Sequence, residues 1–149
     1  LDFTINNKIT IIYGLTNGHI YRHTIEDKIL EDSVKIHESG INKLSIHNNL
    51  IYSCGEDNSI SITDFNTLTL IHKFKQYHSS PIKSLKLHND YLITGSYDQK
   101  LNIFKITNNT LLHIKSIKTC VSEINDVDLS SDNLILAVGQ GVEIFRINQ

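Results

Sequence analysis

The segment HESGINKLSIHNNLIYSCGEDNSISITD, residues 37–64, is followed by a related segment, HSSPIKSLKLHNDYLITGSYDQKLNIFK, residues 78–105. Corresponding residues of the two segments lie 41 positions apart, as His37 and His78 do. The same offset continues to the end of the chain, where three apolar residues recur. The recurring pairs are Leu101 and Val142, Ile103 and Ile144, and Phe104 and Phe145. The chain is therefore built from a repeated unit of about 41 residues.

Each unit has the pattern of four short strands, because apolar and polar residues alternate between turn-forming segments. In the second unit we expect strands over 41–47, 50–54, 59–63 and 68–74, and in the third over 82–87, 91–94, 101–106 and 111–117. A period of about 40–45 residues with four strands is typical of a WD-repeat β-propeller. The sequence predicts an all-β protein of four consecutive blades without a long helix. The blades are placed at about 1–36, 37–77, 78–119 and 120–149.

The last unit contains only three expected strands, between Ile124 and Ile147. A propeller commonly closes when the missing strand of one blade comes from the other end of the domain. The sequence also lacks an initiator methionine, and four blades leave sheet edges open. We therefore expect the chain to be the C-terminal part of a larger ring, of seven blades, in a longer protein.

Composition narrows the function only slightly. The 149 residues are 40% hydrophobic, enough for an ordinary core, and the net charge of −2 gives no general reason to bind nucleic acid or an acidic membrane. No apolar run reaches the length of a membrane span, so we expect no membrane partner. Cys54 and Cys120 lie in different units and form no disulfide framework. A reducing compartment fits, and we expect a cytoplasmic protein.

Certain polar residues recur at fixed places in the two best-defined units. These units resemble WD repeats, in which a His before the first strand, a Ser or Thr in the second strand and an Asp in the next turn hydrogen-bond one another. The matching sets are His37, Ser53, Asp57 and His78, Thr94, Asp98. The Trp that often joins them is absent, and Thr63 and Phe104 stand in its place. We expect structural hydrogen-bond sets, because no nucleophile elbow or oxyanion motif accompanies the Ser, His and Asp.

Metal and phosphate sites are not indicated. His19 and His23 would lie about 13 Å apart on a strand, at about 3.3 Å per residue, which is too far to share a metal ion. The Gly139-Gln140-Gly141 segment lacks the Lys and the following helix of a phosphate loop, and it predicts a tight turn with positive φ. We therefore predict no catalytic residue, no metal site and no cofactor.

Positive charge is concentrated in one part of the chain. Between His72 and Lys118 the only acidic residues are Asp90 and Asp98, whereas eight lysines occur. The lysines are Lys73, Lys75, Lys83, Lys86, Lys100, Lys105, Lys115 and Lys118. This basic region is a candidate surface for RNA phosphates or for an acidic protein partner. The alternative is that the lysines keep strand edges soluble and unpaired.

A closer resemblance rests on three stretches of sequence. Residues 96–104, SYDQKLNIF, resemble the penultimate blade of the WD repeat-containing protein 6 family, and residues 121–128 and 138–145 resemble its last blade. Residues 37–42 fit the opening of the preceding blade. This family comprises large accessory subunits that partner a tRNA 2′-O-ribose methyltransferase.

The resemblance implies a non-catalytic scaffold that binds the methyltransferase subunit and helps to present tRNA, so that the ribose of the anticodon wobble nucleotide is methylated. The methyl donor would belong to the partner, and in this family a different accessory subunit directs the shared enzyme to another position of the anticodon loop. The alternative function is a general protein-interaction propeller, such as a ubiquitin-ligase adaptor or a trafficking scaffold. An F-box or a coiled coil upstream would favour that alternative, whereas further propellers would favour the first.

Overall fold

The structure is a computed structural model that describes residues 2–6, 8–25, 31–130 and 134–146. These residues form fourteen strands and no helix, so nothing in this part of the chain is a helix long and apolar enough to cross a membrane. The first sheet contains β1 (Asp2–Asn6), β2 (Lys8–Gly14), β3 (His19–Thr24) and β4 (Glu31–Lys35). The second contains β5 (Ile41–His47), β6 (Leu50–Gly55), β7 (Ile60–Asp64) and β8 (Leu70–Phe74). The third contains β9 (Ile82–His88), β10 (Tyr91–Ser96), β11 (Lys100–Thr107) and β12 (Thr110–Lys118), and the fourth β13 (Ser122–Leu129) and β14 (Leu134–Arg146).

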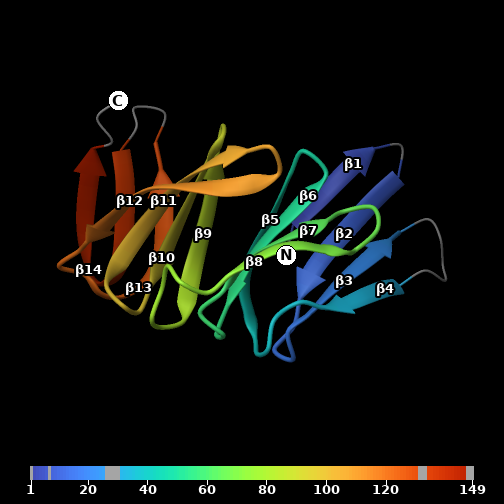
Figure 1. Ribbon diagram of the computed structural model, residues 1–149, viewed down its shortest axis with the longest axis horizontal. Coiled ribbons are helices and arrows are strands. Elements are labelled where there is room, and N and C mark those ends of the chain that lie inside the picture. Colours follow the sequence, from blue (N-terminus) through green and yellow to red (C-terminus); the bar gives the residue numbers. More distant parts are fainter. Residues whose placement is uncertain (1, 7, 26–30, 131–133, 147–149) are drawn as a thin grey trace.

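Within every sheet the strands follow chain order and are antiparallel. The first strand of each sheet contacts the first strand of the next, in the order β1, β5, β9 and β13. These four strands form the inner side of the molecule, and the last strands β4, β8 and β12 lie on the outer side. Figure 1 shows the four sheets following one another across the molecule, from blue to red. The predicted all-β fold with propeller-type blades is confirmed, since four antiparallel sheets follow one another.

Tight turns between the strands depend on asparagine. Asn48 and Asn49 connect β5 to β6 with φ values of 50° and 59°, and Asn108 and Asn109 connect β11 to β12 with 50° and 61°. Two successive residues at positive φ form the turn whose twist matches that of a hairpin, and asparagine tolerates this region better than other non-glycine residues. These turns set the register of the flanking strands.

Apolar residues fill the space between successive sheets. Between the second and third sheets, Tyr52, Ile60 and Ile62 pack with Ile82 and Phe104, and all five side chains are fully buried. Equivalent clusters lie between the first and second sheets and between the third and fourth sheets. Burial of this surface is the main favourable contribution to the free energy of folding.

A small residue allows each inner strand to approach the preceding sheet. A Cβ atom added to Gly14 would lie 2.7 Å from Cγ2 of Ile41, and one added to Gly95 would lie 2.7 Å from Cγ2 of Ile124. The repeat places Cys54 at the corresponding position of the second sheet, where its Sγ is 3.8 Å from the carbonyl oxygen of Ile82. The fourth sheet has Val138 at this position instead.

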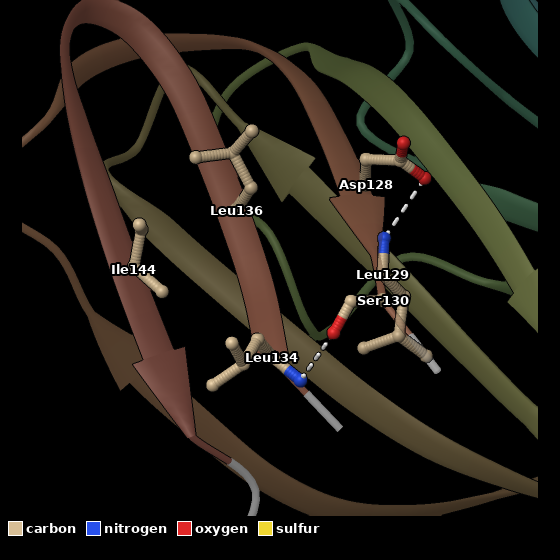
Figure 2. A pocket seen from close by; sticks show the side chains of 6 residues that line it. All are labelled: Asp128, Leu129, Ser130, Leu134, Leu136 and Ile144. Atoms are coloured by element: carbon tan, nitrogen blue, oxygen red, sulfur yellow. Dashed lines mark hydrogen bonds between the residues drawn. The ribbon is translucent and has the colours of Figure 1, made fainter. Parts of the chain in front are cut away.

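The fourth sheet differs from the others in its last strand. Figure 2 shows that β14 turns back on itself, so that Ile144 lies beside Leu134 and Leu136. The turn includes Gly141, whose φ of 145° confirms the predicted positive φ. Thus β14 supplies two of the three predicted strands of the last unit. The blade boundaries proposed from the sequence remain predictions.

We expect Gly95→Ala to destabilise the fold, because the new methyl group would overlap Cγ2 of Ile124 and Cγ2 of Val127, both at 2.7 Å. Overpacking of this kind costs about 1–3 kcal/mol. The matched control is Gly40→Ala, whose Cβ would meet nothing closer than 3.4 Å and should leave stability unchanged or slightly raised. Urea unfolding of both variants measures the difference, and equal midpoints would contradict the proposed close approach.

Candidate functional site

The first predicted polar set comes together in the second sheet. The Nδ1 atom of His37 lies 2.8 Å from Oδ1 of Asp57, and its Nε2 atom lies 2.9 Å from Oγ of Ser53. Since a carboxylate only accepts hydrogen bonds, Nδ1–H is the donor to Asp57. The backbone N–H of Glu38 donates to the other carboxylate oxygen at 3.0 Å. The set thus fixes the loop before β5 to the turn after β6.

The second set repeats this geometry in the third sheet. Nδ1 of His78 lies 3.0 Å from Oδ2 of Asp98, Nε2 lies 2.9 Å from Oγ1 of Thr94, and the N–H of Ser79 donates to Asp98 at 3.0 Å. Thr94 and Ser53 have no exposed surface. Both sets are therefore buried hydrogen-bond networks that join the loop before a sheet to the turn after its second strand.

Sequence reasoning missed the residues that complete these networks. Ser61 bonds Ser53 at 2.7 Å and lies 3.0 Å from Nε2 of His37. In the third sheet Asn102 lies 2.9 Å from Nε2 of His78 and also bonds Ser116. Each stands two residues before the position of the absent Trp. The signal in the sequence is a polar residue between the buried apolar residues of the third strand, such as Ser61 between Ile60 and Ile62.

The two carboxylates are held in their charged form. Burial by itself would raise the pKa of Asp57, but hydrogen bonds from His37, Ser59 and the Glu38 N–H outweigh it and lower the pKa well below its usual value. The pKa of Asp98 is lowered in the same way against burial, by His78 and the Ser79 N–H. Both carboxylates therefore stabilise the folded chain while they are ionised.

We expect Asp98→Ala to lower the free energy of unfolding by about 1–3 kcal/mol, because it leaves the buried His78 ring and the Ser79 N–H without their acceptor. Asp90, an exposed turn residue, supplies the control variant Asp90→Ala, for which no comparable loss is expected. Thermal unfolding measures both. An unchanged melting temperature for Asp98→Ala would show that the network does not hold the turn.

Stability should also fall at acid pH. The folded-state pKa values of Asp57 and Asp98 lie below their unfolded values, so their contribution is complete above the unfolded value of about 3.9 and is lost as the pH falls through the folded value. We expect Asp98→Asn to show a weaker loss of stability than the native chain when the pH is lowered from 5 to about 2. Parallel stability curves would refute a contribution from Asp98.

Half of the eight candidate surface lysines form ion pairs with acidic residues of the same chain. Lys73 lies 3.0 Å from Asp57, Lys86 lies 2.6 Å from Asp128, Lys75 pairs with Glu38, and Lys83 pairs with Glu56. Opposite charges this close leave little net charge to attract a partner. These four lysines therefore contribute little to a basic surface.

The other four lysines form a separate group on β11 and β12, which we call the basic hairpin. Its members are Lys100, Lys105, Lys115 and Lys118. All four are exposed, and none forms an ion pair with a residue that the structure describes. Lys100 and Lys118 are directly opposite in the strand register, where like charges repel. The structure thus concentrates the unneutralised charge on the outer edge of the third sheet.

Two further polar features connect residues of different sheets. At the inner side, Lys43 lies 3.7 Å from Asp126, and with the Lys86–Asp128 pair it lines a hollow of about 420 Å³ bounded by β5, β9 and β13. At the turns, the ammonium of Lys83 lies 4.9 Å from the centre of the Tyr97 ring, and the Tyr97 hydroxyl donates to Asn125 at 3.1 Å. Opposite charges cancel in the hollow, so it carries no net attraction for an ion.

The open face of the fourth sheet is apolar. A hollow of about 260 Å³ is lined by Leu134, Leu136, Ile144 and the end of β13. Figure 2 shows these side chains. Val142 is 66% exposed and Ile144 is 63% exposed, whereas the corresponding Leu101 and Ile103 of the third sheet are at most 3% exposed. This face therefore has the residues of a sheet interface and no sheet packed on it among the described segments, as the expected larger ring requires.

The remaining candidates show no assembled site. His19 and His23 lie on β3, and the ring of His19 is tilted against that of Tyr21 at 6.1 Å. Among the described residues no cluster of His, Cys, Asp or Glu could hold a metal ion. Cys54 and Cys120 are free thiols, and burial raises the pKa of Cys54 to about 12, so its thiol stays protonated.

Comparison with known proteins agrees with this geometry. The family model "WD domain, G-beta repeat" matches residues 30–64 and 68–105, which are the segments that carry the two buried networks. No curated protein sequence matches the chain. The chain is a WD-repeat protein, and each matched segment runs from the outer strand of one sheet, β4 or β8, into the third strand of the next sheet.

Solved structures show the same fold at low sequence identity. The computationally designed Ika4 protein is 19% identical with a TM-score of 0.81, and the match covers 99% of this chain and 90% of that one. The WD40 β-propeller domain of Doa1 is 22% identical with a TM-score of 0.80, and the match covers 96% and 48% of the two chains. The designed Ika8 protein is 17% identical with a TM-score of 0.76, covering 98% and 45%. The chain thus spans about half the length of the last two.

Proposed function

We propose that this WD-repeat chain is part of a non-catalytic accessory subunit of a tRNA 2′-O-ribose methyltransferase, and that it acts in methylation of the anticodon wobble nucleotide. The proposal rests on the resemblance of residues 96–104, 121–128 and 138–145 to the last two blades of the WD repeat-containing protein 6 family. The family match supports the coarser role, because WD-repeat propellers generally act as protein-interaction scaffolds. A cytoplasmic location belongs to the same proposal.

The basic hairpin is the structural observation that supports this function best. It lies within and beside the resembled segment 96–104, and its four lysines are exposed without an acidic partner among the described residues. Such a surface attracts the phosphates of tRNA or an acidic face of the methyltransferase subunit. The chain's own Ser, His and Asp networks are buried, which agrees with an enzyme active site supplied by the partner.

The mechanism would be positioning. A scaffold that binds both the methyltransferase and the tRNA raises the effective concentration of one ribose at an active site that it does not build. S-adenosylmethionine would bind to the partner. The accessory subunit would therefore decide which ribose is presented and take no part in bond formation.

The second candidate function is a general protein-interaction scaffold, such as a ubiquitin-ligase adaptor or a trafficking component. The WD repeats by themselves favour the general scaffold as much as the methyltransferase subunit, because this fold hosts many unrelated functions. Purification of the full-length protein with its partners, followed by mass spectrometry, separates the two. Recovery of a ribose methyltransferase supports the first function, and recovery of a ligase or coat subunit supports the second.

We expect cells that lack the parent protein to lose ribose methylation at the wobble nucleotide of selected tRNAs. Ribose methylation elsewhere in the same anticodon loop should persist, because in the resembled family a different accessory subunit directs it. Mass spectrometry of purified tRNAs measures both positions, and the second position is the internal control. Full wobble-ribose methylation in the deletion strain would refute the proposal and leave the general scaffold in its place.

A further inference from the structure

The strand β12 differs from the outer strands of the preceding sheets. It has nine residues, whereas β4 and β8 have five each. It pairs only with β11, so one side of its backbone is open among the described strands. A long open edge is a template for pairing with another extended segment. This edge also carries two members of the basic hairpin, Lys115 and Lys118.

The internal repeat shows what is missing around Lys118. In the second sheet Lys75, just beyond the end of β8, pairs with Glu38 in the loop before β5. The third sheet places Lys118 at the corresponding end of β12, but Ser79 stands where Glu38 would be. Lys100 lies opposite Lys118 in the register and adds a second positive charge. A carboxylate therefore pairs with the lysine at this position in the second sheet. In the third sheet no described carboxylate pairs with Lys118 or Lys100.

The other face of β12 combines charge with exposed apolar surface. Leu112 is opposite Lys105 in the register, and Lys115 is opposite Ile103. Leu112 is 55% exposed, and Ile114, at the irregularity in the strand, is 51% exposed. An extended segment lying along β12 would cover these apolar side chains and bring its own side chains beside the lysines.

We propose that an extended acidic segment of a partner protein adds to the open edge of β12 as a fifth strand. Because Lys115 and Lys118 are three residues apart, they point to opposite faces of the sheet. The segment therefore carries a carboxylate beside each lysine, on its two faces, and an apolar residue beside Leu112. Backbone hydrogen bonds to β12 give affinity, and the two carboxylates fix register and orientation.

The open edge favours a peptide over a nucleic acid. Only a polypeptide backbone can continue the hydrogen-bond ladder of the sheet, and the Lys75–Glu38 pair shows that a carboxylate fits beside a lysine in this position. Exposed Leu112 and Ile114 also suit a segment with apolar side chains. The proposal does not depend on the tRNA function, because it rests only on the open edge of β12 and on the charges and apolar side chains beside it.

The test uses the full-length protein and a fluorescent nine-residue glutamate–valine peptide whose two glutamates are three residues apart, so that their carboxylates point to opposite faces of the added strand. Three further probes are a lysine–valine peptide of the same length, the acidic peptide with alternate backbone nitrogens methylated, and a nine-nucleotide single-stranded RNA. Fluorescence anisotropy at low salt measures binding, since screening would mask the charge contacts at high salt. We expect the acidic peptide to bind and the other three probes to bind at least about tenfold more weakly.

Charge reversal locates the site. The double variant Lys115→Glu and Lys118→Glu should weaken binding of the acidic peptide by at least about tenfold. Lys35→Glu, on the outer strand β4 of the first sheet, is the matched control and should leave binding unchanged. Circular dichroism melting confirms that the variants are folded. Since both substitutions are at exposed sites, little change in melting temperature is expected.

Several results would overturn the proposal. Equal binding of the methylated peptide would show attraction by charge alone, without strand addition. Preferred binding of the RNA would identify the basic hairpin as a nucleic-acid surface. Failure of the acidic peptide to bind, or unchanged binding by the double variant, would leave the lysines as protection of an open edge.

Discussion

The packing of each innermost strand against the preceding sheet is the contact on which the rest of the structure depends. In each case an isoleucine of the inner strand approaches a small residue of the preceding sheet. These isoleucines are Ile41 in β5, Ile82 in β9 and Ile124 in β13. This approach is close enough that one added methyl group at Gly14 or Gly95 would overlap the isoleucine. Repetition of one contact therefore sets the same spacing between sheets, and it places the networks of the second and third sheets in equivalent positions.

Much of this fold could be predicted from the sequence, because the strands are short, local and repeated. The strand expected over 41–47 coincides with β5, and the other strands of the two middle units differ by a residue or two at their ends. The His, Ser or Thr, and Asp members of each network were also predictable, since they recur at the offset of the repeat. Ser61 and Asn102 were not, because their types differ and their burial depends on the neighbouring sheet.

The distribution of free charge could not be predicted, for a physical reason. The pairs Lys73–Asp57 and Lys75–Glu38 join segments that lie far apart in the sequence and meet only through the sheet register. A count of charges along the chain treats Lys75 and Lys118 alike, although one is neutralised and the other is not. Comparison of equivalent positions in two units separates them, because the same backbone carries Glu38 in one unit and Ser79 in the other.

The fourth sheet shows what the two middle sheets gain from their networks. It has Ala137 where the third sheet has Thr94, its turn at Gly141 contains no Asp, and its far face is apolar and exposed. Packing against the third sheet is its main support among the described contacts, so it should open at a lower free energy than the second and third sheets. The basic hairpin belongs to the third sheet, whose buried His78 network reaches Ser116 of β12 through Asn102. A partner binding at β12 therefore meets a preformed edge, and little binding energy is lost in ordering it.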